Sequence, residues 1–70
     1  MIRKNVNSTN ILTVGYEAES GILEIEFHSG GIYQYFNVPP AVFNELICAS
    51  SCGSYFHQHI KNQYKWTKIQ

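Results

Sequence analysis

Aspartate is missing from this 70-residue chain, and so are a glycine-rich phosphate loop and a serine set in a nucleophile elbow. These absences argue against the common phosphate-transfer and hydrolase sites. A grouping of Ser51, His57 and Glu45 can be drawn, but nothing in its spacing supports a catalytic triad. We therefore expect no catalytic residues, no cofactor and no enzyme.

An excess of charge and long apolar runs are also lacking. Five lysines and arginines balance five glutamates, so the formal net charge is zero. No run of 18 apolar residues exists, and residues 1–4 lack the apolar core of a signal peptide. We expect a cytoplasmic protein without membrane contact. All cations lie near the termini and all carboxylates between residues 17 and 45, so one edge would be basic if the termini converged.

Cysteine is scarce, with only Cys48 and Cys52. A cytoplasmic location predicts reduced thiols, and helical i,i+4 spacing is an awkward geometry for a disulfide. With His57 and His59 these cysteines supply the ligand types of zinc. The two histidines would point to different faces of a helix, however, so we expect no metal site.

The composition is that of a globular protein, with 44% hydrophobic and 14% aromatic residues. We expect residues 1–70 to form a single domain. A chain of this size buries only about 60% of the surface that its unfolded form exposes. Its stability is therefore marginal, which makes self-association a reasonable expectation.

Residues 23–38 carry the strongest structural signal, because two alternating runs flank Ser29-Gly30-Gly31 and predict a β-hairpin. An even loop would place Gln34 beside the apolar row of Leu23, Ile25 and Phe27, whereas an odd loop would place Tyr33 and Tyr35 there. Burying an unpaired amide costs about 1–3 kcal/mol. We therefore predict a three-residue loop, with Ile32 and Phe36 exposed on the outer face as a contact surface.

The remaining pattern predicts an α+β fold, namely a three-stranded antiparallel meander followed by two short helices. Residues 11–16 form the first strand, and residues 1–7 an extended arm. Pro39-Pro40 ends the sheet, and residues 41–50 show an apolar helical stripe. Ser51 caps a second helix in which Phe56 and Ile60 face inward. Residues 64–69 fit either a short fourth strand or a tail.

The order of apolar, aromatic and glycine residues along the chain resembles that of the KTSC domain family. This family is named after the C-terminal extension of some lysyl-tRNA synthetases. Its most specific part here is Tyr33-x-Tyr35 followed by Val38-Pro39, and the likeness runs over nearly the whole chain. The family occurs both as an appendage of a tRNA enzyme and as small separate proteins. The resemblance implies RNA binding. This chain departs from the family in having His57 where asparagine is common, which puts a shared ligand role of that position in doubt.

Aromatic side chains interleaved with lysines form the candidate ligand-binding surface. Stacking rings and cations are what single-stranded nucleic acid requires. For the two hairpin tyrosines the register favours packing in the core over stacking on bases. The candidate residues are Tyr55, His57, Lys61, Tyr64, Lys65 and Trp66, with Tyr33, Tyr35 and the further terminal lysine Lys68.

Two functions follow from the sequence. The first is a non-catalytic module that binds RNA or a nucleotide-like ligand by stacking and charge. The second is a homo-oligomeric interaction protein, in which exposed Ile32 and Phe36 dock a partner or form an intersubunit pocket for a small ligand. The near-neutral charge favours the second, and the resemblance favours the first.

Overall fold

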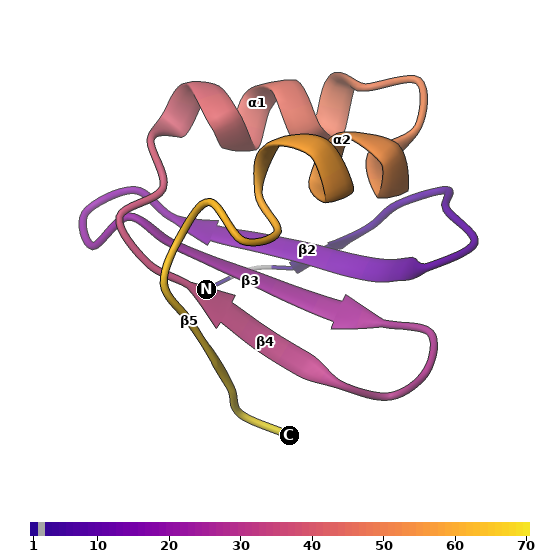
Figure 1. Ribbon diagram of the computed structural model, residues 1–70, viewed down its shortest axis with the longest axis horizontal. Coiled ribbons are helices and arrows are strands. Elements are labelled where there is room, and N and C mark those ends of the chain that lie inside the picture. Colours follow the sequence, from indigo (N-terminus) through magenta and orange to yellow (C-terminus); the bar gives the residue numbers. More distant parts are fainter. Residues whose placement is uncertain (2) are drawn as a thin grey trace.

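Five strands and two helices make up the protein (Figure 1). The computed structural model describes residue 1 and residues 3–70. In chain order the elements are β1 (Arg3–Asn5), β2 (Ile11–Glu17), β3 (Ile22–Phe27), β4 (Ile32–Tyr35), α1 (Pro40–Cys48), α2 (Cys52–His59) and β5 (Trp66–Lys68).

All five strands form one antiparallel sheet in the order β1-β2-β3-β4-β5, so the predicted α+β class is confirmed and the predicted strand count is too low. The tail is a strand, since Trp66 pairs with Tyr35 and Lys68 with Tyr33. Residues 3–5 also form a strand, where we predicted only an arm; Ile2 of that arm lies outside the described residues. All three residues of β1 are exposed, so no apolar alternation marks the strand in the sequence.

The hairpin register is the predicted one. Leu23 pairs with Tyr35 and Ile25 with Tyr33, which places both tyrosines on the same face as the apolar row. The backbone nitrogen of Phe27 donates to the carbonyl of Gly31 at 2.9 Å, so the loop is residues 28–30 and not 29–31. It still has odd length, and this preserves the register. Gly30 has a φ of 106°, a conformation that disfavours any side chain.

The core lies between the inner face of the sheet and the two helices (Figure 1). Each large aliphatic side chain buried there stabilises the fold by about 1.5–3 kcal/mol. The buried cluster comprises Ile11, Val14, Leu23, Ile25, Tyr35, Val38, Leu46, Cys52, Phe56 and Ile60.

Both helices begin where the sequence predicted. Pro40 occupies the first turn of α1, where its missing N–H removes no hydrogen bond. The Ser51 hydroxyl accepts a hydrogen bond from the Ser54 backbone nitrogen at 3.2 Å and caps α2. Phe56 and Ile60 are buried as predicted. The two helices therefore cover the sheet through a small number of inward side chains.

The outer face of the sheet is polar at its centre. Arg3 from β1 lies 3.3 Å from a Glu24 carboxylate oxygen and 3.4 Å from one of Glu26. Gln34 donates to Glu24 at 2.9 Å, and the Thr13 hydroxyl donates to Glu26 at 3.2 Å. The carboxylates of β3 are thus held by groups on neighbouring strands.

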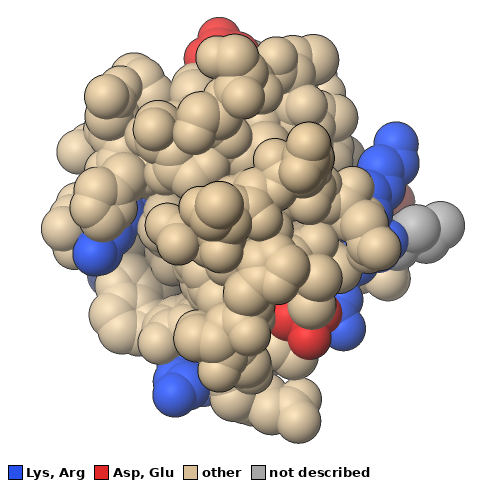
Figure 2. All heavy atoms as spheres, turned by 90° about the vertical axis from the view of Figure 1, so that its right-hand side faces the viewer, with Lys and Arg blue, Asp and Glu red and all other residues tan. Residues whose placement is uncertain are grey.

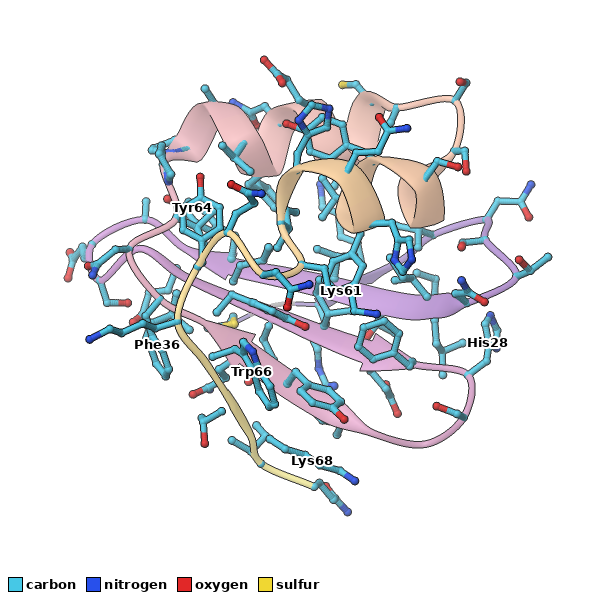
Figure 3. The ribbon with its side chains drawn as sticks, viewed as in Figure 1. His28, Phe36, Lys61, Tyr64, Trp66 and Lys68 are labelled. Carbon is cyan, nitrogen blue, oxygen red and sulfur yellow. The ribbon has the colours of Figure 1, made fainter. Side chains whose placement is uncertain are left out.

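Ile32 and Phe36 lie on this outer face but are less exposed than predicted. Ile32 pairs with Glu26, and only 9% of its surface is exposed. The backbone nitrogen of Ile69 donates to the Ile32 carbonyl at 2.8 Å, so the chain after β5 runs alongside Ile32. Phe36 is half-buried, on the side of the sheet turned away from the helices (Figure 3). The predicted exposure is therefore wrong for Ile32 and holds only in part for Phe36.

The cations near the two termini do not form one basic edge, because the two terminal strands do not converge. Strands β1 and β5 lie at opposite edges of the sheet, and Figure 2 shows blue side chains on opposite sides of the molecule. Arg3 is engaged with glutamates, whereas Lys61, Lys65 and Lys68 are exposed around β5. In the described part of the chain, no helix is long and apolar enough to cross a membrane.

Candidate aromatic ligand-binding site

A hollow of about 520 Å³ opens between α2 and the strands β4 and β5. In Figure 1 the helices lie over β2 and β3, while β4 and β5 extend beyond them. We call this space the aromatic hollow. It is lined by Thr9, Asn10, Phe27, His28, Ser29, Tyr33, Tyr35, Phe56, His57, Lys61, Asn62 and Trp66.

Five aromatic rings from three strands and one helix form the wall of the aromatic hollow. Tyr33 contacts Phe27 edge-on, with ring centroids 5.5 Å apart, and Trp66 at a tilt, with centroids 5.4 Å apart. Phe56 of α2 contacts Phe27 at 5.4 Å and Tyr35 at 5.5 Å, both edge-on. The rings brace one another, so the wall is formed before any ligand arrives.

Trp66 is the most accessible of these rings, with 52% of its surface exposed. Tyr33 is half-buried, and Phe56 and Tyr35 are buried. The hollow therefore passes from a dry interior to an open indole at the sheet edge. This increase in solvent exposure suits a flat apolar ligand that keeps one side exposed to water.

Cationic and hydrogen-bonding groups surround the opening. Lys61 follows α2 and Lys68 belongs to β5, where its ammonium nitrogen lies 6.0 Å from the centroid of the Tyr33 ring. Figure 3 shows these lysines together with Trp66. Among the described lining residues there is no carboxylate. Glu24 and Glu26 face the opposite side of the sheet, where Arg3 contacts both.

The tyrosine at the bottom of the hollow stays protonated. Burial, with a smaller contribution from neighbouring Tyr33, raises the pKa of Tyr35 from 10.0 to about 12. At neutral pH its hydroxyl is therefore a neutral group that can donate or accept a hydrogen bond. It adds no negative charge to the hollow.

Two loops close one end of the aromatic hollow and hold each other in place. The ring nitrogen Nε2 of His28 lies 3.0 Å from the Ser8 carbonyl, and the His28 backbone nitrogen donates to the Asn10 carbonyl at 2.8 Å. Because a carbonyl only accepts, the imidazole donates here. The Ser8 hydroxyl in turn accepts from the backbone nitrogens of Asn10 and Ile11. This end of the site is consequently fixed by side chains of both loops.

The structure brings together five of the predicted ligand-binding residues and separates three others from them. Tyr33, Tyr35, His57, Lys61 and Trp66 line the aromatic hollow. Tyr64 and Lys65 line a neighbouring hollow that also includes Trp66.

Tyr55 lies apart from the aromatic hollow. Its hydroxyl donates to Glu45 of α1 at 2.7 Å, and its ring contacts His59 at a tilt, with centroids 4.5 Å apart. That hydrogen bond is the main reason why the pKa of Tyr55 is raised to about 12. The side chain links the two helices on their outer side.

Sequence reasoning missed several lining residues. Phe27 and Phe56 were assigned to the core alone, although each also faces the aromatic hollow. Thr9, Asn10 and Asn62 were not among the predicted site residues. The pairing of Ser8-Thr9-Asn10 with the hairpin loop joins segments about twenty positions apart, and no local pattern reports it.

The cysteines take no part in the aromatic hollow. Cys48 is exposed and Cys52 is buried, and both are free thiols. The Cys52 thiol donates to the Leu46 carbonyl at 3.2 Å and so joins the end of α1 to the start of α2. No group of three or more histidine, cysteine or carboxylate side chains that could hold a metal occurs within residues 1 and 3–70.

The five-stranded antiparallel sheet, with two helices on one face and an aromatic hollow beside them, defines a small α+β domain. The sequence profile of the KTSC domain matches residues 7–64, and the chain belongs to this family. The resemblance inferred from the residues is thereby confirmed.

Three relatives illustrate where such chains occur. A crystal structure of a KTSC domain protein from Yersinia pestis has a TM-score of 0.96 and 36% identity, and the match covers 99% of this chain and 97% of that one. An uncharacterised protein of Stutzerimonas stutzeri is 41% identical over 70 residues, 99% of each chain. A lysine–tRNA ligase from a Nostoc strain is 48% identical over 54 residues, which is 77% of this chain but 10% of the ligase.

Proposed function

We propose that this chain is a non-catalytic, cytoplasmic binding module that holds single-stranded RNA, with one base in the aromatic hollow. The observation that supports this proposal most strongly is that five aromatic rings and two nearby lysines surround one opening. Within the described residues this lining includes no carboxylate.

Stacking supplies the contact that suits a base. An aromatic side chain that stacks on a base contributes about 1–3 kcal/mol and tolerates any base, because each has a π-face. Trp66 offers an exposed ring, and Tyr33 lies beside it with its ring inclined by 59°. Asn10, Asn62 and His57 provide hydrogen-bonding groups at the rim for the edge of the base.

The separation of carboxylates from lysines favours binding of an RNA phosphate beside the aromatic hollow. The net charge is zero, yet the carboxylates of β3 lie on the outer face while Lys61 and Lys68 lie by the hollow. A phosphate therefore meets cations locally without a strongly basic protein. The salt dependence of binding is expected to be modest, since few phosphates are neutralised.

The relatives give independent support for an RNA ligand. A segment similar to this chain lies within proteins that are named lysine–tRNA ligases, from Nostoc and from Trichormus variabilis. A module that holds RNA fits beside an enzyme of that name. The full-length match in Stutzerimonas stutzeri indicates that the segment also occurs alone.

The intrinsic fluorescence of Trp66 tests the proposal, because this is the only tryptophan of the chain. Titration with single-stranded RNA at several salt concentrations should change the emission saturably, with weaker binding at higher salt. Duplex RNA should bind more weakly, since its bases are already stacked. A flat emission signal, together with no heat of binding in calorimetry, would contradict the proposal.

A further inference from the structure

Two further hollows adjoin the aromatic hollow, one at each end. The first, of about 540 Å³, shares Thr9, Asn10 and His57 with it. The second, of about 570 Å³, shares Asn62 and Trp66 with it. The shared residues are walls common to neighbouring spaces, so the three hollows form one series. We call the first the polar hollow and the second the turn hollow.

Most of the residues that line the polar hollow carry hydroxyl or amide groups. Such groups both donate and accept hydrogen bonds, as sugar hydroxyls and phosphate oxygens require. Its residues besides the shared ones are Asn7, Ser8, Ser50, Ser51, Cys52, Gly53, Ser54 and Gln58.

The turn hollow combines an aromatic ring with a cation. Residues 62–66 line it, and these include half-buried Tyr64 and exposed Lys65. In Figure 3, Tyr64 and Trp66 point away from each other, on either side of the chain between α2 and β5. A ring and a lysine recur here as they do in the aromatic hollow.

We infer that the three hollows form one track for a linear RNA segment of about three nucleotides, with its middle base in the aromatic hollow. This rests on the proposed function and extends it, because a ligand of one nucleotide would fill only the central space. Trp66 belongs to two hollows and so contacts two successive nucleotides. The sugar and phosphate at one end meet the polar hollow.

Charge along the track agrees with a polyanion. No carboxylate lines any of the three hollows among the residues that the structure describes. Lys61 lines the aromatic hollow and Lys65 lines the turn hollow. Positive charge is therefore distributed along the track. A compact ligand with one charged group would need only one of these lysines.

The wall between the aromatic hollow and the polar hollow is held in place before binding. The hydroxyl of Ser8 accepts two backbone hydrogen bonds from Asn10 and Ile11, and the His28 ring contacts the Ser8 carbonyl. A Cβ added at Gly53 would lie 3.5 Å from that hydroxyl, so α2 approaches the loop closely. A preformed wall lowers the ordering cost of binding.

Affinity as a function of ligand length tests the track. Calorimetry would compare adenosine monophosphate, triadenylate and hexaadenylate at one salt concentration. The track predicts that triadenylate binds at least about fivefold more tightly than the monophosphate. Hexaadenylate should gain only the small statistical advantage of its extra binding registers. A matched set of variants locates the gain: Gln58→Ala in the polar hollow, Lys65→Gln in the turn hollow and, as control, Lys4→Gln on β1.

The outcomes separate this inference from the proposed function. Gln58→Ala and Lys65→Gln should each lower the affinity for triadenylate more than that for the monophosphate, and Lys4→Gln should alter neither. Equal affinity for the monophosphate and triadenylate would overturn the track while leaving a single-base site in place. Failure of all three ligands to bind would overturn both.

Discussion

Tyr33 and Trp66 meet across neighbouring strands, with ring centroids 5.4 Å apart and planes inclined by 59°. The contact exists because Trp66 of β5 pairs with Tyr35 of β4, which sets its ring diagonally against Tyr33. The last strand of the sheet therefore completes the aromatic hollow. Without β5 the inner rings would face an open edge.

Replacing Trp66 by alanine should weaken RNA binding about 5- to 150-fold, the loss expected for one stacking ring. Trp66→Phe should restore part of the affinity because it keeps a smaller ring. Ile69→Ala is the matched control, since Ile69 is 48% exposed just after the same strand but pairs with Ile32 on the outer face. Calorimetry measures all three. Equal affinities of Trp66→Ala and Ile69→Ala would count against stacking.

Removing single lysines should flatten the salt dependence of RNA binding. Each phosphate contact with single-stranded nucleic acid contributes about 0.7 to the slope of log affinity against log salt. Lys61→Gln and Lys68→Gln should each reduce the slope by about that amount. Lys4→Gln, on the opposite edge of the sheet, should not. A slope that responds equally to all three substitutions would mean that charge acts without a defined site.

Two glycine substitutions should change stability in opposite directions. Gly30→Ala should destabilise the protein by about 1–3 kcal/mol, because a φ of 106° is unfavourable for a side chain. Gly53→Ala should stabilise it by about 0.4–1 kcal/mol, since Gly53 is helical and the new Cβ meets only ordinary contacts of 3.5 Å and beyond. Urea unfolding measures both free energies. A change of the same sign in both unfolding free energies would contradict the described conformation of Gly30 or the free space beside Gly53.

Stability should fall between about pH 10 and pH 12. The pKa of Tyr35 is 10.0 in an unfolded chain and about 12 in the fold. Its stabilising contribution is therefore complete below pH 10 and is lost as pH rises towards 12, because only the unfolded state releases the proton in this range. Tyr35→Phe keeps the ring and should make the decline in unfolding free energy shallower. An unchanged decline in that variant would show that Tyr35 is not buried as described.

How much the sequence predicted depends on whether local periodicity carries the information. The alternation of residues 23–27, together with the cost of burying the Gln34 amide, was enough to fix the hairpin register. Proline at residue 40 and serine at residue 51 were enough to place both helix starts. Strand β1 escaped notice, because three exposed polar residues held by backbone pairing leave no pattern.

The candidate site was predictable in its residue types but not in its outline. Rings and lysines near the C-terminus were recognised as a stacking surface, and five of the eight predicted residues do line one hollow. Tyr55 could not be distinguished from them, because its partner Glu45 lies on another helix. Burial of Ile32 likewise depends on the chain beside β5, which only the three-dimensional pairing reveals.

The most direct test of the central claim is a residue-by-residue map of RNA contact. Amide chemical shifts of the isotope-labelled protein would be followed during titration with triadenylate. We predict the largest changes at Asn10 and at residues 57–68, with little change at Glu24 and Gln34 on the outer face. Changes centred on the outer face, or none at saturating RNA, would contradict the account.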